Sequence, residues 1–144
     1  MIRKLIPFLE RILLTLWVGS LWAVGFIVAP VLFAELNDRA LAGSTAGTLF
    51  TLTSYIGLVC GCTLLILSAA VRKCINWRAL VITGMLLLVV IGQFVITPMV
   101  VDLRVQGLTD TPRFGQLHGV ASMLFLLTSI FGLVLVAAGQ TRED

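Results

Sequence analysis

The chain has 144 residues, of which 59% are hydrophobic and only 12% are charged. Soluble domains are about half apolar and about one quarter charged, so this composition excludes an ordinary soluble domain and indicates an integral membrane protein. The net charge of +3 does not indicate nucleic-acid binding, because the basic residues lie at the ends of apolar segments, as in membrane proteins.

The first long apolar segment, residues 12–34, contains no charged residue and lies between Arg11 and Glu35. About 20 apolar helical residues cross the hydrocarbon core of a bilayer, so this segment predicts a transmembrane helix. We expect residues 1–11 to form a short basic leader that Pro7 breaks from this segment, and Pro30 to kink its far end. One face gathers small and bulky residues expected to pack against a neighbouring helix: Gly19, Trp22, Gly25, Pro30 and Phe33.

Three further apolar segments follow, at residues 46–71, 79–101 and 114–139. We expect Asp38 to cap the second helix, and Thr111 the fourth. Pro98 lies near the end of the third segment, as Pro30 does in the first, and is also expected to be a packing residue. Short connections make consecutive helices antiparallel neighbours. The sequence therefore predicts an all-α integral membrane four-helix bundle, with residues 1–144 in a single domain.

The basic residues predict how these helices are oriented. If both termini and the turn at 72–78 share one side, that side holds seven of the ten Lys and Arg residues: Arg3, Lys4, Arg11, Arg72, Lys73, Arg78 and Arg142. The other side holds Arg39, Arg104 and Arg113. Because cytoplasmic loops carry the excess of basic residues, we expect a multi-pass protein of the bacterial inner membrane with both termini in the cytoplasm.

Two stretches of the sequence resemble two later ones. LFTLTSYIGLV (49–59) matches LFLLTSIFGLV (124–134) at eight of eleven positions, and FIVAP (26–30) resembles FVITP (94–98). Helices one and three run in the same direction, so these matches predict two parallel repeats related by an axis along the membrane normal.

Polar residues gather where the first and third helices end and the fourth begins. Glu35 and Asp102 follow the two prolines, and an extra segment in the second half brings Arg113, Gln116 and His118 to the same level. These five residues are therefore predicted to form an outward-facing polar site. His118, the only histidine, could serve as a proton carrier, a metal ligand or a haem ligand. The alternative is a structural hydrogen bond to a loop or an acid.

Gln93 and Thr97 lie one turn apart inside the third segment and are candidate intramembrane polar residues. They fit either a hydrogen bond between helices or a polar pathway. Cys60 and Cys62 diverge by about 200° on a helix and do not share a metal ion. No metal or other cofactor is therefore predicted, with haem or copper as alternatives.

Two motifs carry a resemblance to known families: Trp22-x-x-Gly25-x-x-x-x-Pro30-x-Leu32-Phe33, and Phe114-x-x-x-His118-Gly119-x-x-Ser122. Over nearly the whole chain they resemble the bacterial four-span family of unknown function related to human transmembrane protein 205. The first motif is also similar to the first span of the copper-resistance-D and membrane-bound protoporphyrinogen oxidase superfamily. That oxidase family binds haem and uses a first-span histidine and a later lysine. This chain has neither residue at such positions, so the resemblance implies the fold rather than the oxidase activity.

Three function classes remain open. The leading hypothesis is a non-enzymatic accessory or scaffold unit in the bilayer, with a membrane-protein partner or as a homo-oligomer. The second is a membrane redox, haem or metal-handling protein that uses His118. The third is a small transporter, which a parallel repeat with a small-residue interior would suit.

Overall fold

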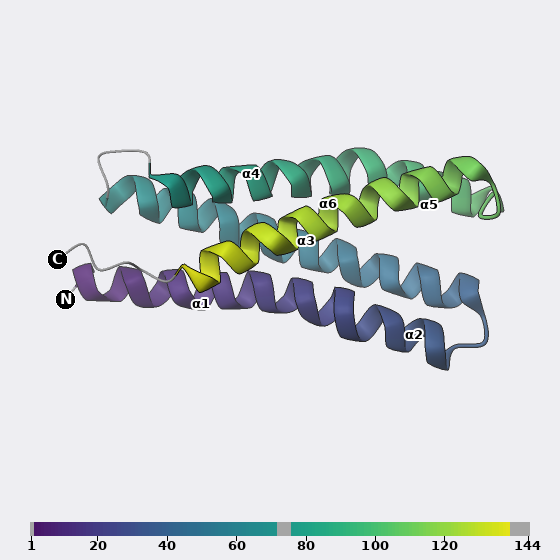
Figure 1. Cartoon of the computed structure of the whole chain (residues 1–144), viewed down its shortest axis with the longest axis horizontal. Helices are drawn as coiled ribbons and strands as arrows, with labels where there is room; N and C mark the ends of the chain where they lie inside the picture. The colour runs from purple at the N-terminus through teal and green to yellow at the C-terminus, as the bar shows by residue number, and fades with distance from the viewer. Residues whose placement is uncertain (1, 72–75, 139–144) are drawn as a thin grey trace.

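The computed structural model describes residues 2–71 and 76–138, which form four long helices running side by side (Figure 1). Each is long and apolar enough to cross a membrane: Ile6–Glu35, Arg39–Ala69, Trp77–Val105 and Pro112–Ala137. The predicted all-α four-helix bundle is thereby confirmed. Three residues of the orientation argument, Arg72, Lys73 and Arg142, lie outside the described residues, as does residue 139 at the end of the fourth predicted segment.

The first and third crossings are each divided by a π-helical segment. In chain order the elements are α1 (Ile2–Trp22), η1 (Ala23–Val28), α2 (Ala29–Glu35), α3 (Arg39–Val71), α4 (Trp77–Ile91), η2 (Gly92–Ile96), α5 (Thr97–Val105) and α6 (Pro112–Ala137). The expectation that Pro7 would end a separate leader is wrong, because α1 runs through it. Pro7 lies so near the start of α1 that its ring disturbs only the first turns.

Side-chain caps begin three of the helices. Asp38 accepts hydrogen bonds from the backbone N–H groups of Ala40 and Leu41, at 2.8 and 3.2 Å, as predicted for the second crossing. Thr111 accepts one from Phe114 at 3.3 Å, which confirms the predicted cap of α6. Asn76 caps α4 through Ala79 at 2.8 Å. These bonds satisfy N–H groups that have no partner inside the helix.

At Pro30, where the sequence predicts a kink, a wide π turn directly precedes the proline. The N–H of Ala29 bonds to the carbonyl of Val24, and the N–H of Thr97 bonds to that of Gly92. Each bond spans five residues and ends one residue before a proline. The wider turn keeps each crossing continuous through a position at which the proline offers no N–H group.

The helices form a ring in which α1 packs against α3, α3 against α4, α4 against α6, and α6 against α1. In Figure 1, α6 runs obliquely, beginning beside α5 and ending beside α1. We call the half of the bundle where α1 begins and α6 ends the terminal half. The opposite half, with α2, α5 and the starts of α3 and α6, is the distal half.

The terminal half holds the tightly packed core. Its centre is Trp17, which is fully buried and lies against Gly57 and Gly61 of α3. A Cβ at Gly57 would overlap the indole ring, so only glycine lets the helix approach this closely. The surrounding buried residues come from all four crossings: Leu14, Cys60, Leu64, Ile82, Met85, Val89 and Leu135.

The distal half is held by fewer contacts. There α2 packs on α3 and α5 packs on α6, but the backbone of neither α5 nor α6 packs closely on α2. Where the halves meet, the ring of Phe125 lies edge-on to Phe26 and Phe50, with centroids 5.5 and 5.6 Å apart. The same ring fills the space over Gly25, where a Cβ would overlap it. This aromatic layer, formed by Phe26, Phe50 and Phe125, marks the boundary between the distal half and the terminal half.

Candidate functional site

A pocket of about 280 Å³ lies on one flank of the distal half, between α5 and the start of α6. It brings together two of the five residues of the predicted polar site, Asp102 and Arg113. Polar groups of Gln106 and Thr111 line it as well. Its apolar lining consists of Met99, Leu103, Leu108 and Leu117.

The turn after α5 positions this pocket. Gly107 has a φ of 72°, a left-handed conformation that glycine adopts without strain. Its N–H bonds to the carbonyl of Arg104 at 3.0 Å, and the N–H of Leu108 bonds to that of Leu103 at 2.9 Å. This is the Schellman pattern of a helix end. It reverses the chain so that α6 starts against the flank of α5 that carries Asp102.

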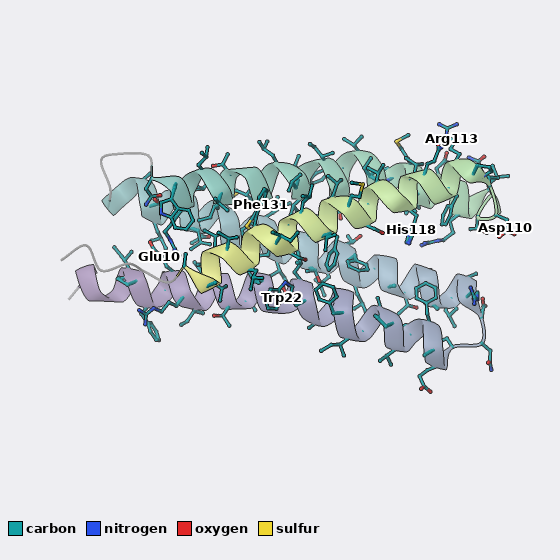
Figure 2. The ribbon with its side chains drawn as sticks, in the orientation of Figure 1. Glu10, Trp22, Asp110, Arg113, His118 and Phe131 are labelled. Atoms are coloured by element: carbon teal, nitrogen blue, oxygen red, sulfur yellow. The ribbon has the colours of Figure 1, made fainter. Side chains whose placement is uncertain are left out.

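His118 lies on a different side of α6 from this pocket. It is exposed, and its ring lies parallel to that of Phe114, with centroids 6.2 Å apart. Figure 2 shows His118 on the side of α6 that faces α2 and α3, whereas Arg113 points the opposite way. His118 therefore does not share a site with Asp102 and Arg113.

The other two predicted members of the site also lie apart from the pocket. Glu35 is the last residue of α2, a segment that does not pack closely on α5 or α6, and Gln116 is on the exposed surface of α6. Of the five residues predicted to converge at this end, Asp102 and Arg113 share the pocket, and the other three lie outside it.

The two intramembrane polar residues do not pair with each other. Thr97 donates its hydroxyl hydrogen bond to the carbonyl of Gly92, at 2.9 Å, within the π turn. Gln93 lies half-buried in η2, and its side chain makes no hydrogen bond to residues 2–71 or 76–138. Its role, as an interhelical tie or part of a polar pathway, stays a prediction.

The predicted packing residues have different surroundings. Gly25 receives the ring of Phe125, and Phe33 lies beside Gly43, 3.7 Å from the position a Cβ would take. Trp22 is half-buried, and Pro30 and Pro98 are exposed. Gly19 is exposed and has no atom within 4 Å of its Cβ position. Among the described residues, no helix packs on Gly19.

Arg104 is a polar residue of the distal half that the sequence reasoning missed. The predicted third segment ends at residue 101, which leaves Arg104 in the loop that follows, but α5 continues to Val105. Two residues along a helix diverge by about 200°, so Arg104 turns away from the pocket of Asp102. Its guanidinium nitrogens lie 3.5 and 3.3 Å from the Cβ positions of Gly43 and Gly47. Extending the helix beyond Asp102 would have revealed this inward position.

A second polar group, also missed, lies in the terminal half. Glu10, Ser68, Asn76 and Arg78 line a cavity of about 20 Å³, with room for a single water molecule. Arg78 also donates a hydrogen bond to the carbonyl of Leu135 at 3.4 Å, which ties α4 to α6. Glu10 falls within the predicted basic leader, but in the structure it is a half-buried residue of α1.

The metal-ligand residues of the described chain are dispersed. Among residues 2–71 and 76–138, no three His, Cys, Asp or Glu side chains lie close enough to hold a metal ion. Cys60 is buried in the core whereas Cys62 is exposed, as their predicted divergence on one helix requires. His118 remains the only histidine through which a haem or metal could be bound.

Comparison with known proteins places the chain in a family. Residues 12–109 match the family model described as a domain of unknown function, DUF4149. The match spans the first three crossings and ends before α6 and His118. No curated protein and no solved structure matches the chain.

Proposed function

The chain belongs to the DUF4149 family, and from its own geometry we propose that it is a non-enzymatic accessory or scaffold unit that binds other membrane components. The surface of α1 and η1 carries this proposal. Thr15, Gly19 and Ala23 follow one another at intervals of four residues, and all three are exposed. In lipid, small residues at this spacing let a second helix approach closely. The partner is a second copy of this chain or another membrane protein.

Co-purification of two differently tagged copies from mild detergent tests this surface. In Gly19→Ile, the larger side chain blocks close approach, and we expect the second tag to be lost. Gly84→Ile is the matched control. Gly84 also has open space around it, but the residues one turn before and after it are the bulky Leu80 and Leu88, so it does not belong to a row of small residues. If no second copy is retained, a stable membrane-protein partner should be captured by the wild type and lost in Gly19→Ile. Equal capture by both variants would contradict the proposal.

We further propose the bacterial inner membrane as the location, with both termini in the cytoplasm. An excess of Lys and Arg at the terminal end supports this orientation, and the resemblance to the transmembrane protein 205 family supports the bacterial origin. Topology reporters fused after Gln106 and at the N-terminus test it. We expect a periplasmic signal from the first and a cytoplasmic signal from the second, and the reverse result would overturn the orientation.

The two halves of the chain are proposed to be parallel repeats. Met85 stands 68 positions after Trp17, the offset that also separates Pro98 from Pro30. These are two of the largest fully buried residues, and each lies on a glycine of the following helix. Trp17 contacts Gly57 and Met85 contacts Gly132, 75 positions later. The contacts differ in closeness, because the Cβ position of Gly132 lies 3.5 Å from Met85 and nearer to Val18. The proposal is also supported by the two π segments, which precede Pro30 and Pro98.

This repeat favours a small transporter as the second candidate function, since several transporter folds are built from repeats related in this way. Solute uptake into liposomes containing the purified protein would support it over the scaffold. The redox, haem or metal-handling alternative rests on His118. An absorption spectrum and metal analysis distinguish it: a Soret band or stoichiometric copper that is lost in His118→Ala would support it. A protein without either would favour the scaffold.

A further inference from the structure

Arg104 is a cation turned into the bundle without an anionic partner. Its side chain is half-buried, and its guanidinium lies against the backbone of α3 at Gly43 and Gly47. Within the described ranges 2–71 and 76–138 it makes neither an ion pair nor a side-chain hydrogen bond. A guanidinium carries five N–H donors in a fixed fork, so most of its hydrogen-bonding capacity is available to a ligand.

None of the described acids of the distal half pairs with Arg104. Asp38 uses its carboxylate to cap α3. Asp102 faces the pocket that it shares with Arg113, on the opposite flank of α5. Glu35 is exposed at the end of α2, and Asp110 is exposed in the turn between α5 and α6 (Figure 2). Arg104 therefore has no carboxylate partner among the described residues.

His118 faces the same side from α6. Phe125, seven residues later and so on the same helix face, points inward to Phe26 and Phe50. His118 is two turns beyond this aromatic layer and is exposed, because α2 does not pack on α6 there. Figure 2 shows its imidazole directed toward α2 and α3. A ring nitrogen of His118 is thus available as a hydrogen-bond donor on α6, on the side that faces α3.

The location of Arg104 near the end of its helix sets its depth in the bilayer. Arg104 is the second-last residue of α5, which places it near the depth of lipid phosphates. In this half α2 does not pack closely on α5 or α6, so a lipid headgroup has lateral access from the bilayer.

From these observations we propose that Arg104, with His118 as a second donor, binds the phosphate of an anionic phospholipid between the two helix pairs of the distal half. The planar guanidinium suits phosphate oxygens, which it contacts with two parallel hydrogen bonds. The lipid tails then cover the exposed apolar flanks of α2 and α5. This site names a lipid as one of the membrane components that the protein is proposed to bind. It depends on the proposed function only because it requires the protein to lie in a bilayer.

The test uses the full chain in nanodiscs of phosphatidylcholine with a minor fraction of phosphatidylglycerol, and native mass spectrometry to measure retained phosphatidylglycerol. We expect Arg104→Gln to lower the apparent affinity about tenfold, the factor expected for losing a charge-assisted contact. Arg113→Gln is the matched control, since it removes the same charge from the same end but faces the other flank. Equal losses in the two variants would overturn the site, because general attraction alone would then explain retention.

Two further arms keep the result interpretable. Arg104→Lys retains the charge but lacks the planar fork, so its lipid retention should be lower than that of the wild type. This comparison remains possible if Arg104→Gln does not insert. Wild-type retention in Arg104→Lys would overturn the role of the guanidinium. Inorganic phosphate is added in excess to the same discs, and displacement of the lipid by it would assign the site to free phosphate instead. Gly19→Ile should retain phosphatidylglycerol normally, so a failed self-association assay is distinguishable from a failed lipid site.

Discussion

The terminal and distal halves of this bundle are built from the same four crossings but differ in how closely the helices pack. In the terminal half all four helices touch their neighbours around Trp17, and the cavity beside Glu10 and Arg78 has a volume of only about 20 Å³. In the distal half the helices separate into two pairs, with a pocket of about 280 Å³ on one flank. The first half therefore provides rigidity, and the second offers accessible polar groups.

The difference shows how a chain with so few polar residues separates stability from binding. Packing in lipid depends on close backbone approach, because lipid is as apolar as the helices themselves. Gly57 and Gly61 accept Trp17, so the terminal half gains this close approach. In the distal half, Gly43 and Gly47 face the guanidinium of Arg104 instead. The same residue type thus serves helix packing at one end and a polar side chain at the other.

The largest effect on stability is expected from Gly57→Ala, which tests whether the terminal half is more tightly packed than the distal half. The added Cβ overlaps the indole of Trp17, which is fully buried and has no room to move. We expect a loss of about 2–3 kcal/mol of unfolding free energy, at the upper end for overpacked cores. The measurement is reversible unfolding in mixed detergent–lipid micelles. Gly84→Ala, with open space around it, is the control, and an equal loss there would show that the terminal half is not specially packed.

Phe125→Ala should loosen the distal half without unfolding the terminal half. The ring of Phe125 bridges Gly25, Phe26 and Phe50. Because lipid can replace part of its surroundings, we expect a loss of only about 1–2 kcal/mol, less than for a Phe in a soluble core. Hydrogen exchange should rise in residues 23–35 and 112–125 and stay unchanged in 77–91. The control is Leu126→Ala, at a half-exposed neighbouring position; uniform exchange across all helices would contradict two distinct halves.

The smallest expected effect on unfolding free energy comes from removing one helix cap in each half. Asn76→Ala removes a 2.8 Å cap bond in the terminal half, and Thr111→Ala removes a 3.3 Å bond in the distal half. Losing a cap costs about 0.5–2 kcal/mol, and we expect the shorter bond of Asn76 to be the more costly. Unfolding free energies of both variants in the same micelles measure this order. A larger loss for Thr111→Ala would mean that the distal end contributes more to stability than its packing suggests.

Much of the fold follows from composition and periodicity alone. Four uncharged segments separated by short polar turns predict four crossings, because only helices satisfy their own backbone groups in lipid. The caps at Asp38 and Thr111 could be predicted in the same way, since a cap depends only on residues within one turn. Pro7 was misjudged, because its effect depends on how far from the helix start it falls.

The polar site was beyond prediction, because it depends on where each helix ends and how it tilts. The sequence by itself determined that Asp102, Arg113, Glu35, Gln116 and His118 lie at one end of the bundle. Only the tertiary structure decided that Asp102 and Arg113 share a pocket, that His118 faces another side, and that Arg104 turns inward. If the third helix is taken to end at residue 101, four residues too early, Arg104 falls in a loop and its direction is undefined. No local pattern reports that α6 begins beside α5 and ends beside α1. Helix type is a local property of the chain, whereas the direction of a side chain at a helix end is set by packing between segments distant in sequence.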